Sequence, residues 1–146
     1  MSQRLFENLK EYLVSIRPVA DYIGEGTDAR FYKSYARQGV PTPYVVCHVF
    51  EGSSEEHLQG ITGMASNRVE INCYADSSET AYKLAETIRL SPLQCFRGTM
   101  GNVFVHSVTS TDGYMEGADP PAKDGDSPRF WVMRDYIIHH QEPVAA

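Results

Sequence analysis

Hydrophobic residues near the start of the chain recur every three or four positions, which is the spacing of one face of an α-helix. Charged residues fill the positions between them, and the apolar ones are Leu5, Leu9, Tyr12, Leu13 and Ile16. Pro18 ends or restarts this helix, because proline disfavours helical geometry in the residue before it. The pattern predicts an amphipathic first helix and then a short helical turn that ends at Gly24.

Strand-like patterns follow in the middle and at the end of the chain. Residues 44–50, YVVCHVF, are apolar on both alternating faces, which indicates a strand buried on both sides. Residues 68–75 alternate, with Val69, Ile71, Cys73 and Ala75 on one face. Two more strands are expected at about 102–110 and 129–140, and a short edge strand near residue 31. The stretch between, residues 51–66, reads as a polar connection whose only large aliphatics are Leu58 and Ile61.

A second amphipathic helix follows the strand at residues 68–75 almost directly. Asp76 is the expected N-cap, with Glu79 three positions later as in a capping box. A buried stripe then recurs at helical spacing, formed by Ala81, Leu84, Ala85 and Ile88. No glycine loop, nucleophile or metal-ligand cluster stands at this junction, so we interpret the unit as structural.

The succession of elements predicts an α+β fold in a single domain, residues 1–146. Adjacent strands favour antiparallel pairing. We therefore expect a mostly antiparallel sheet of about four strands, with two main helices packed on one face.

The last strand is apolar on both faces. Trp131, Met133 and Ile137 fall on one side, while the opposite side holds Phe130, Val132, Tyr136 and Ile138. One helical layer covers only one face of a sheet, so the other face is covered either by loops or by another subunit. Aromatic residues, Met and Arg are typical of interface cores.

Charge is concentrated in one segment. The chain carries a net charge of −6, and residues 112–127 hold five acidic residues and one basic one, so this segment carries −4 of it. Its glycines and Pro120–Pro121 predict a mobile acidic loop, which includes Asp112, Glu116 and Asp119. An acidic surface opposes stable nucleic-acid binding, because that affinity comes from basic groups that displace counterions.

Candidate catalytic and metal-binding groups are scattered. Cys47, Cys73 and Cys95 form no CxxC, so neither a zinc site nor a disulfide framework is predicted, and a reducing cytoplasm is the expected compartment. His139 and His140 are neighbours on a strand and face opposite sides. No signal segment or apolar run of about 20 residues is present, so no membrane association is expected. We expect no catalytic residues, no metal and no cofactor.

The order of several patterns resembles the tail-completion (tail-terminator, or head–tail joining) proteins of long-tailed bacteriophages and prophages. The resemblance covers about residues 5–140, and it rests on VADYIG, RQGVPTPYVVCHVF, HLQGITG, RVEINCYADSSETAYKLAETI, GNVFVHSV and SPRFWVMRDYIIHH. The most specific part is PYVV followed later by the strand–helix junction. Cys47–His48 departs from the aromatic residue that often follows PYVV, and the acidic loop is long for the family.

The resemblance implies a non-enzymatic virion protein, made in the host bacterial cytoplasm. Such proteins form a ring, commonly a hexamer, on the head-proximal end of the tail, where they contact the tail tube protein and the head–tail connector protein. On this basis the expected interface residues are Leu58, Ile61, Phe130, Trp131, Met133, Tyr136, Asp112, Glu116 and Asp119. An acidic loop that faces the lumen would let DNA pass without sticking, and the alternative is an exposed loop with no role.

Two alternatives stay open from the sequence. One is a different role in the same virion, either a head–tail connector adaptor or a minor tail protein. The other is a small ligand-binding or enzymatic α+β domain, which would require a pocket with convergent polar groups.

Overall fold

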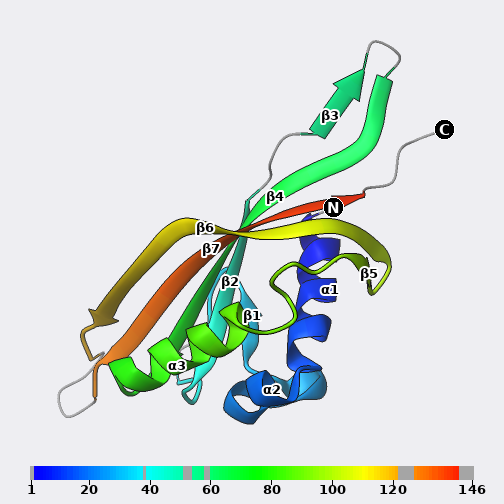
Figure 1. Cartoon of the computed structure of the whole chain (residues 1–146). Helices are drawn as coiled ribbons and strands as arrows, with labels where there is room; N and C mark the ends of the chain where they lie inside the picture. The colour runs from blue at the N-terminus through cyan, green and yellow to red at the C-terminus, as the bar shows by residue number, and fades with distance from the viewer. Residues whose placement is uncertain (1, 38, 51–53, 58–59, 122–126, 142–146) are drawn as a thin grey trace.

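The computed structural model describes residues 2–37, 39–50, 54–57, 60–121 and 127–141. Three α-helices and one 3₁₀ turn combine with strands in an α+β arrangement (Figure 1). The elements in order are α1 (Ser2–Val14), α2 (Arg17–Ile23), η1 (Gly26–Asp28), β1 (Phe31–Lys33), β2 (Tyr44–Phe50), β3 (Ser54–His57), β4 (Gly60–Ala75), α3 (Ser78–Arg89), β5 (Gly98–Met100), β6 (Val103–Asp119) and β7 (Arg129–Gln141).

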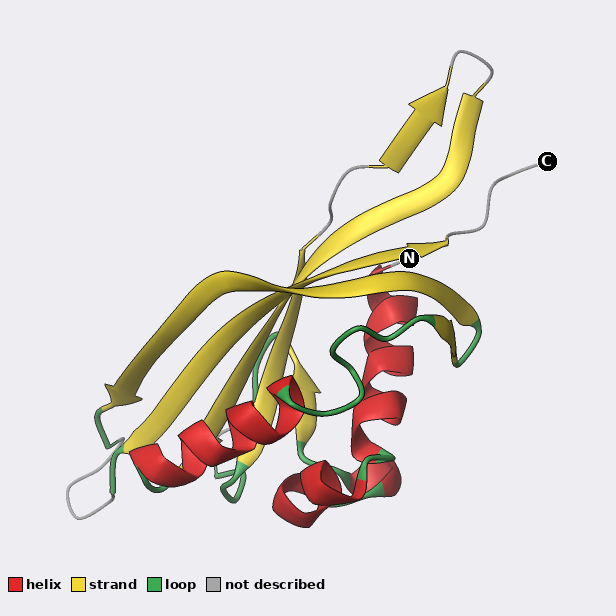
Figure 2. Cartoon of the chain, viewed as in Figure 1, coloured by secondary structure: helices red, strands yellow, loops and turns green. Residues whose placement is uncertain are grey.

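The strands form one strongly twisted sheet in the order β1-β2-β4-β7-β6-β5, with β3 paired to the first part of β4 (Figure 2). β1 and β2 are parallel, and the other pairs are antiparallel. The predicted α+β class is confirmed. The expected sheet of about four strands is wrong, because the described part of the chain has seven, and the expected two main helices are three.

Two segments that the sequence assigned to loops are strands. Residues 54–57 and 60–66 were expected within a polar connection, but they form β3 and the start of β4. Residues 112–119 were expected within a mobile loop, but they continue β6 and pair with β7 from Tyr114↔Arg134 to Asp119↔Arg129. Residues 122–126 of that predicted loop lie outside the described residues.

The main core lies between the three helices and one face of the sheet, and Figures 1 and 2 show all three helices on that side. Val69, Ile71, Cys73 and Ala75 on β4 face the helices, as predicted. They meet the stripe of α3 and the apolar face of α1, whose residues Leu5, Leu9 and Leu13 are fully buried. We call this side of the sheet the helix face and the opposite side the outer face.

The N-cap of α3 is one residue later than predicted. The Ser77 side chain, not Asp76, accepts a hydrogen bond of 3.1 Å from the Thr80 backbone N–H. Asp76 instead accepts a hydrogen bond of 2.6 Å from the Thr42 hydroxyl, which ties this corner to the segment before β2.

Replacing Ser77 by Ala is expected to lower the free energy of unfolding by about 1 kcal/mol, because an N–H of the first helical turn loses its acceptor. Urea denaturation of wild type and variant measures the difference. Ser78→Ala, one position further and within the helix, is the matched control, and an equal loss there would argue against the cap.

A second polar contact holds α3 to the sheet. Glu86 accepts two hydrogen bonds from Arg89, at 3.0 and 2.6 Å, and one of 2.7 Å from Nη2 of Arg134 on β7. The guanidinium of Arg134 also lies 4.5 Å from the centre of the Tyr114 ring on β6. The hydrogen bonds from Arg89, together with the charges of both arginines, lower the pKa of Glu86. One carboxylate therefore links α3 to β7.

Candidate interaction surface

The outer face of the sheet carries a row of three aromatic side chains. Tyr44 on β2 is opposite Tyr74 on β4, and Tyr74 is opposite Trp131 on β7. The rings of Tyr44 and Tyr74 stack with centres 4.9 Å apart and planes 10° from parallel. Arg129 donates a hydrogen bond of 2.9 Å to the Tyr44 hydroxyl and one of 3.2 Å to the Val40 carbonyl. The row is buried at Tyr44 and half-buried at Tyr74 and Trp131.

Trp131 is held against β6 by a glycine. An added Cβ at Gly117, the residue paired with Trp131, would lie 2.3 Å from Cζ2 of the indole. The six-membered ring of the indole therefore packs directly against Gly117. This packing fixes the position of the half-exposed indole on the outer face.

Replacing Gly117 by Ala is expected to push the indole away from the sheet. The ring can swing toward solvent, so we expect the free energy of unfolding to fall by less than about 1 kcal/mol. Because Trp131 is the single tryptophan of the chain, its fluorescence reports the change directly, and the emission maximum should move to longer wavelength. Gly98→Ala is unsuitable as a control because Gly98 has a φ of +140°. Ala118→Gly, next to the contact, is the control, and it should leave the emission unchanged.

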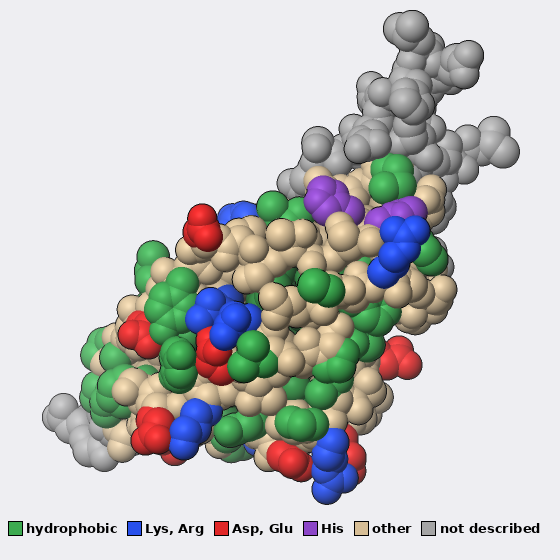
Figure 3. Space-filling model, in the orientation of Figure 1, with side chains coloured by type: hydrophobic (Ala, Val, Ile, Leu, Met, Phe, Trp, Pro, Cys, Tyr) green, Lys and Arg blue, Asp and Glu red, His purple; other side chains and the backbone are tan. Residues whose placement is uncertain are grey.

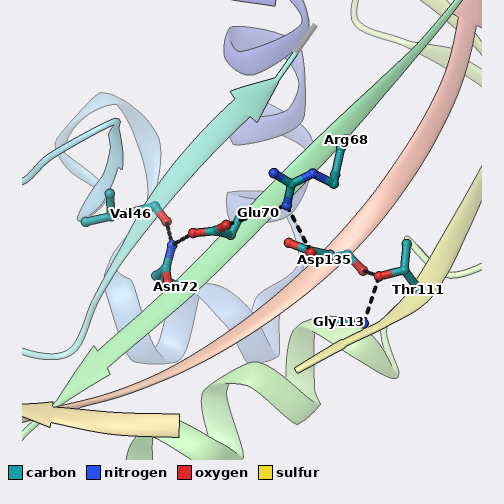
Figure 4. A network of polar contacts seen from close by, with 7 residues as sticks. All are labelled: Val46, Arg68, Glu70, Asn72, Thr111, Gly113 and Asp135. Atoms are coloured by element: carbon teal, nitrogen blue, oxygen red, sulfur yellow. Dashed lines mark hydrogen bonds and ion pairs between the residues drawn. The ribbon is translucent and has the colours of Figure 1, made fainter. Parts of the chain in front are cut away.

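A polar network crosses the outer face beside the aromatic row (Figure 4). Asn72 donates to the Val46 carbonyl at 3.4 Å and to Oε1 of Glu70 at 3.1 Å. Arg68 donates to Oδ2 of Asp135 at 3.0 Å, and its Nη1 lies 3.7 Å from Oε2 of Glu70. These contacts tie β2, β4 and β7 together at mid-sheet.

The network extends to β6 through an irregularity in that strand. Thr111 donates to the Asp135 carbonyl at 3.4 Å and accepts from the Gly113 N–H at 3.0 Å. The register of β6 against β7 shifts between Ser110 and Tyr114. An added Cβ at Gly113 would lie 2.5 Å from Oδ2 of Asp135, so β6 folds closely over this carboxylate. The outer face is thus an ordered surface with apolar and polar parts.

The interface residues that were expected from the sequence lie on different faces of the structure. Trp131 and Met133 lie half-exposed on the outer face, whereas Phe130 is half-exposed on the helix face. Tyr136 is only 2% exposed and belongs to the main core, so its side chain is not available to a partner and its assignment to an interface is wrong. The burial of Tyr136 also raises the pKa of its hydroxyl.

The other proposed residues fall on two different elements. Asp112, Glu116 and Asp119 are exposed along β6. Ile61 belongs to β4, and its side chain lies outside the described part, as does the whole of Leu58. Among the described residues, the end of the 51–66 stretch pairs with the last strand from Met64↔Gln141 to Ser66↔His139.

Sequence reasoning missed two apolar residues of the outer face. Met115 is 55% exposed and pairs with Met133 on β7, and Phe50 is 40% exposed, with the Arg68 guanidinium 4.0 Å from the centre of its ring. Met115 was missed because its segment was taken for a loop. The sequence gives no clear strand signal there, because Gly113 and Gly117 interrupt the segment among acidic residues. Figure 3 views the molecule from the side of α3, and there hydrophobic side chains lie among charged ones toward the end of the β6–β7 hairpin, at the left of the view.

The start of β4 forms an arm with β3. His57 pairs with Gly60 and Ser54 with Ala65, while pairing of β4 with β7 ends at Met64↔Gln141. Figure 1 shows this hairpin projecting beyond the helices and the rest of the sheet. A hairpin that projects in this way is accessible to whatever lies next to the subunit.

The buried thiols do not suit nucleophilic chemistry. Burial raises the pKa of Cys47 to about 12, with the Glu70 carboxylate adding to the effect, and burial likewise raises the pKa of Cys73. Thiols in this state stay protonated and fill space in the core. Among the described side chains, no three His, Cys, Asp or Glu residues stand together as metal ligands would.

Comparison of the chain with protein-family models and with curated protein sequences gives no match. None of the helices in the described part of the chain is long and apolar enough to cross a membrane.

Proposed function

We propose that this protein is a structural subunit of a bacteriophage or prophage tail. In this role an oligomeric ring, commonly a hexamer, caps the head-proximal end of the tail tube. It ends tail polymerisation and joins the tail to the head connector. Its partners are further copies of itself, the tail tube protein and the head–tail connector protein. The order of the sequence patterns supports this role, and so does the outer face of the sheet.

One observation carries most of that support. The sheet is covered by helices on a single face, while the outer face presents Trp131, Met133 and the exposed Met115 on adjacent strands. Apolar surface of this kind, bordered by polar side chains, is typical of protein–protein contacts. Assembly into a ring would cover part of it, and the projecting β3–β4 hairpin provides a second element for docking.

Electron microscopy of lysates after deletion of the gene from its phage or prophage tests the function. Tails of uncontrolled length beside DNA-filled heads would support a terminator. Tails of normal length that stay detached from the heads would support the joining or adaptor role instead. Normal infectious particles would overturn the tail assignment, and a ligand-binding or enzymatic α+β domain would become the better explanation.

A substitution tests whether the outer face takes part. Trp131→Ala, checked for folding by circular dichroism, should reduce tail completion in a complementation assay. Tyr82→Ala, at a 43% exposed aromatic residue of α3 on the helix side of the molecule, is the control, and equal defects from both substitutions would mean that the outer face is not special.

A further inference from the structure

We propose that copies of this chain associate head to tail through the two lateral edges of the sheet. The open edge of β6 in one copy would contact the β1 edge of the next copy. This inference deepens the proposed function, on which it rests, by naming the two surfaces that would meet in a ring. We call residues 112–119 of β6 the acidic edge, and residues 33–37, the end of β1 with the segment after it, the basic edge.

The two edges carry opposite charge. Asp112, Glu116 and Asp119 are exposed on the acidic edge, and residues 107–121 include no Lys or Arg. Lys33 and Arg37 are exposed on the basic edge, and residues 29–50 include no Asp or Glu. Opposite charges within a few ångströms attract, and like charges facing each other across a contact cost several kcal/mol. Charge thus favours contact between unlike edges and opposes contact between like edges.

The edges also lie at the same level of the sheet. Strand register connects Tyr32 of β1 to Val46, Val46 to Asn72, Asn72 to Met133 and Met133 to Met115 of β6. Tyr32 and Met115 are therefore the two ends of one row that crosses five strands. In the same way Lys33 lies on the row of Tyr114, through Cys47, Ile71 and Arg134. A second copy placed beside the first along these rows therefore brings Lys33 opposite Tyr114, between Asp112 and Glu116.

Strand direction agrees with this placement. β1 runs parallel to β2, and each step from β2 through β4 and β7 to β6 is antiparallel. β6 therefore runs opposite to β1, and the β1 of a neighbouring copy would lie antiparallel to it. No described strand pairs with β6 on its open side beyond Val105, the last residue paired with β5. An unpaired strand edge is a ready site for contact with another chain.

Both edges carry exposed apolar side chains beside their charges. Tyr35 on the basic edge is 74% exposed, while Tyr114 and Met115 on the acidic edge are 39% and 55% exposed. The β1 edge is short, and local hydrogen bonds already use the Phe31 N–H and the Lys33 carbonyl. Side chains, more than a long backbone ladder, would therefore hold the contact.

A head-to-tail contact uses two different patches of each subunit, and it closes into a ring when the rotation between copies allows. A contact between two β6 edges would instead place the acids of both copies against each other. The charge pattern therefore favours a cyclic assembly over a twofold dimer through this edge.

Charge exchange tests the contact. One variant carries Asp112→Lys and Glu116→Lys, and the other carries Lys33→Glu and Arg37→Glu. In an assembly of either variant alone, the two edges that meet would carry charges of the same sign. In an equimolar mixture, the two variants can alternate, and each contact then joins opposite charges. A single chain that carries all four substitutions also joins opposite charges at each contact, with the signs of the two edges exchanged. Sedimentation velocity at low salt measures association, and circular dichroism confirms that each variant is folded.

We expect wild type to self-associate, and less so at high salt because salt screens exposed charges. Each two-site variant should self-associate at least about tenfold more weakly. The mixture and the four-site chain should recover association. The contact is wrong if wild type stays monomeric up to its solubility limit at low salt, if either variant associates like wild type, or if neither recovery occurs. Those results would leave the outcome of the gene deletion untouched, so failure of the contact and failure of the tail function can be told apart.

Discussion

Replacing Leu84 by Ala is expected to lower the free energy of unfolding by about 2–5 kcal/mol. Leu84 lies in the middle of α3, is fully buried, and belongs to the core between the helices and the sheet. The substitution removes buried apolar surface and leaves a cavity that close-packed neighbours fill only in part. The loss is a large fraction of the stability of an ordinary domain. Urea denaturation followed by far-ultraviolet circular dichroism measures it.

Leu90→Ala is the matched control for this prediction. Leu90 is the C-cap residue directly after α3, and it is 65% exposed. The same chemical change there removes little buried surface, so we expect a difference within about 0.5 kcal/mol of wild type. Comparable losses at both positions would show that the loss at Leu84 does not come from its burial, and that the helices do not pack on the sheet as described.

The parts of the fold that could be predicted are those whose own side chains determine their structure. The spacing of Leu5, Leu9 and Leu13 defines α1, and the alternation of Val69, Ile71 and Cys73 defines the second half of β4. In both cases the buried residues repeat with the period of a helix or of a strand, so the spacing alone identifies the element. The same holds for the stripe of α3, whose helix was found with its N-cap displaced by one residue.

The missed strands depend on their neighbours. β3 and the start of β4 have few large apolar residues, and the second half of β6 contains Gly113 and Gly117 among acids. Such segments read as loops when taken alone. Residues 114–119 of β6 are extended because β7, which is strongly strand-forming, supplies the pairing from Arg134 to Arg129. Tertiary pairing overrides a weak local preference in this way.

The candidate surface was only partly predictable for a related reason. A strand that is apolar on both faces does not reveal which face meets the helices. Trp131 and Met133 proved to be on the outer face, whereas Tyr136 proved to be in the core. The choice follows from register, since Tyr136 pairs with Val69 on the dry side of β4. The acids of β6 were found, but their placement on a sheet edge depended on the same pairing.

Glu86→Gln is expected to lower the free energy of unfolding by about 1–2 kcal/mol. The side chains of Glu86 and Arg134 are 16% and 19% exposed, so solvent screens their attraction in part and the loss stays below that of a fully buried pair. Glutamine keeps the length of the side chain and one acceptor oxygen, but it removes the charge that faces both Arg89 and Arg134. Thermal or urea denaturation at neutral pH measures the change.

The pH dependence separates the charge of Glu86 from its packing. Because the folded state lowers the pKa of this carboxyl, its contribution to stability is complete above the ordinary pKa of a glutamate and disappears as the pH falls through the lowered value. The difference between wild type and Glu86→Gln should therefore be largest near neutral pH and shrink in acid. Glu79→Gln is the control, since Glu79 pairs with Lys83 on the same helix at 2.9 Å but both side chains are mostly exposed. We expect no measurable change there. A difference for Glu86 that persists unchanged in acid would show that the shape of this side chain, and not its charge, fixes α3 to β7.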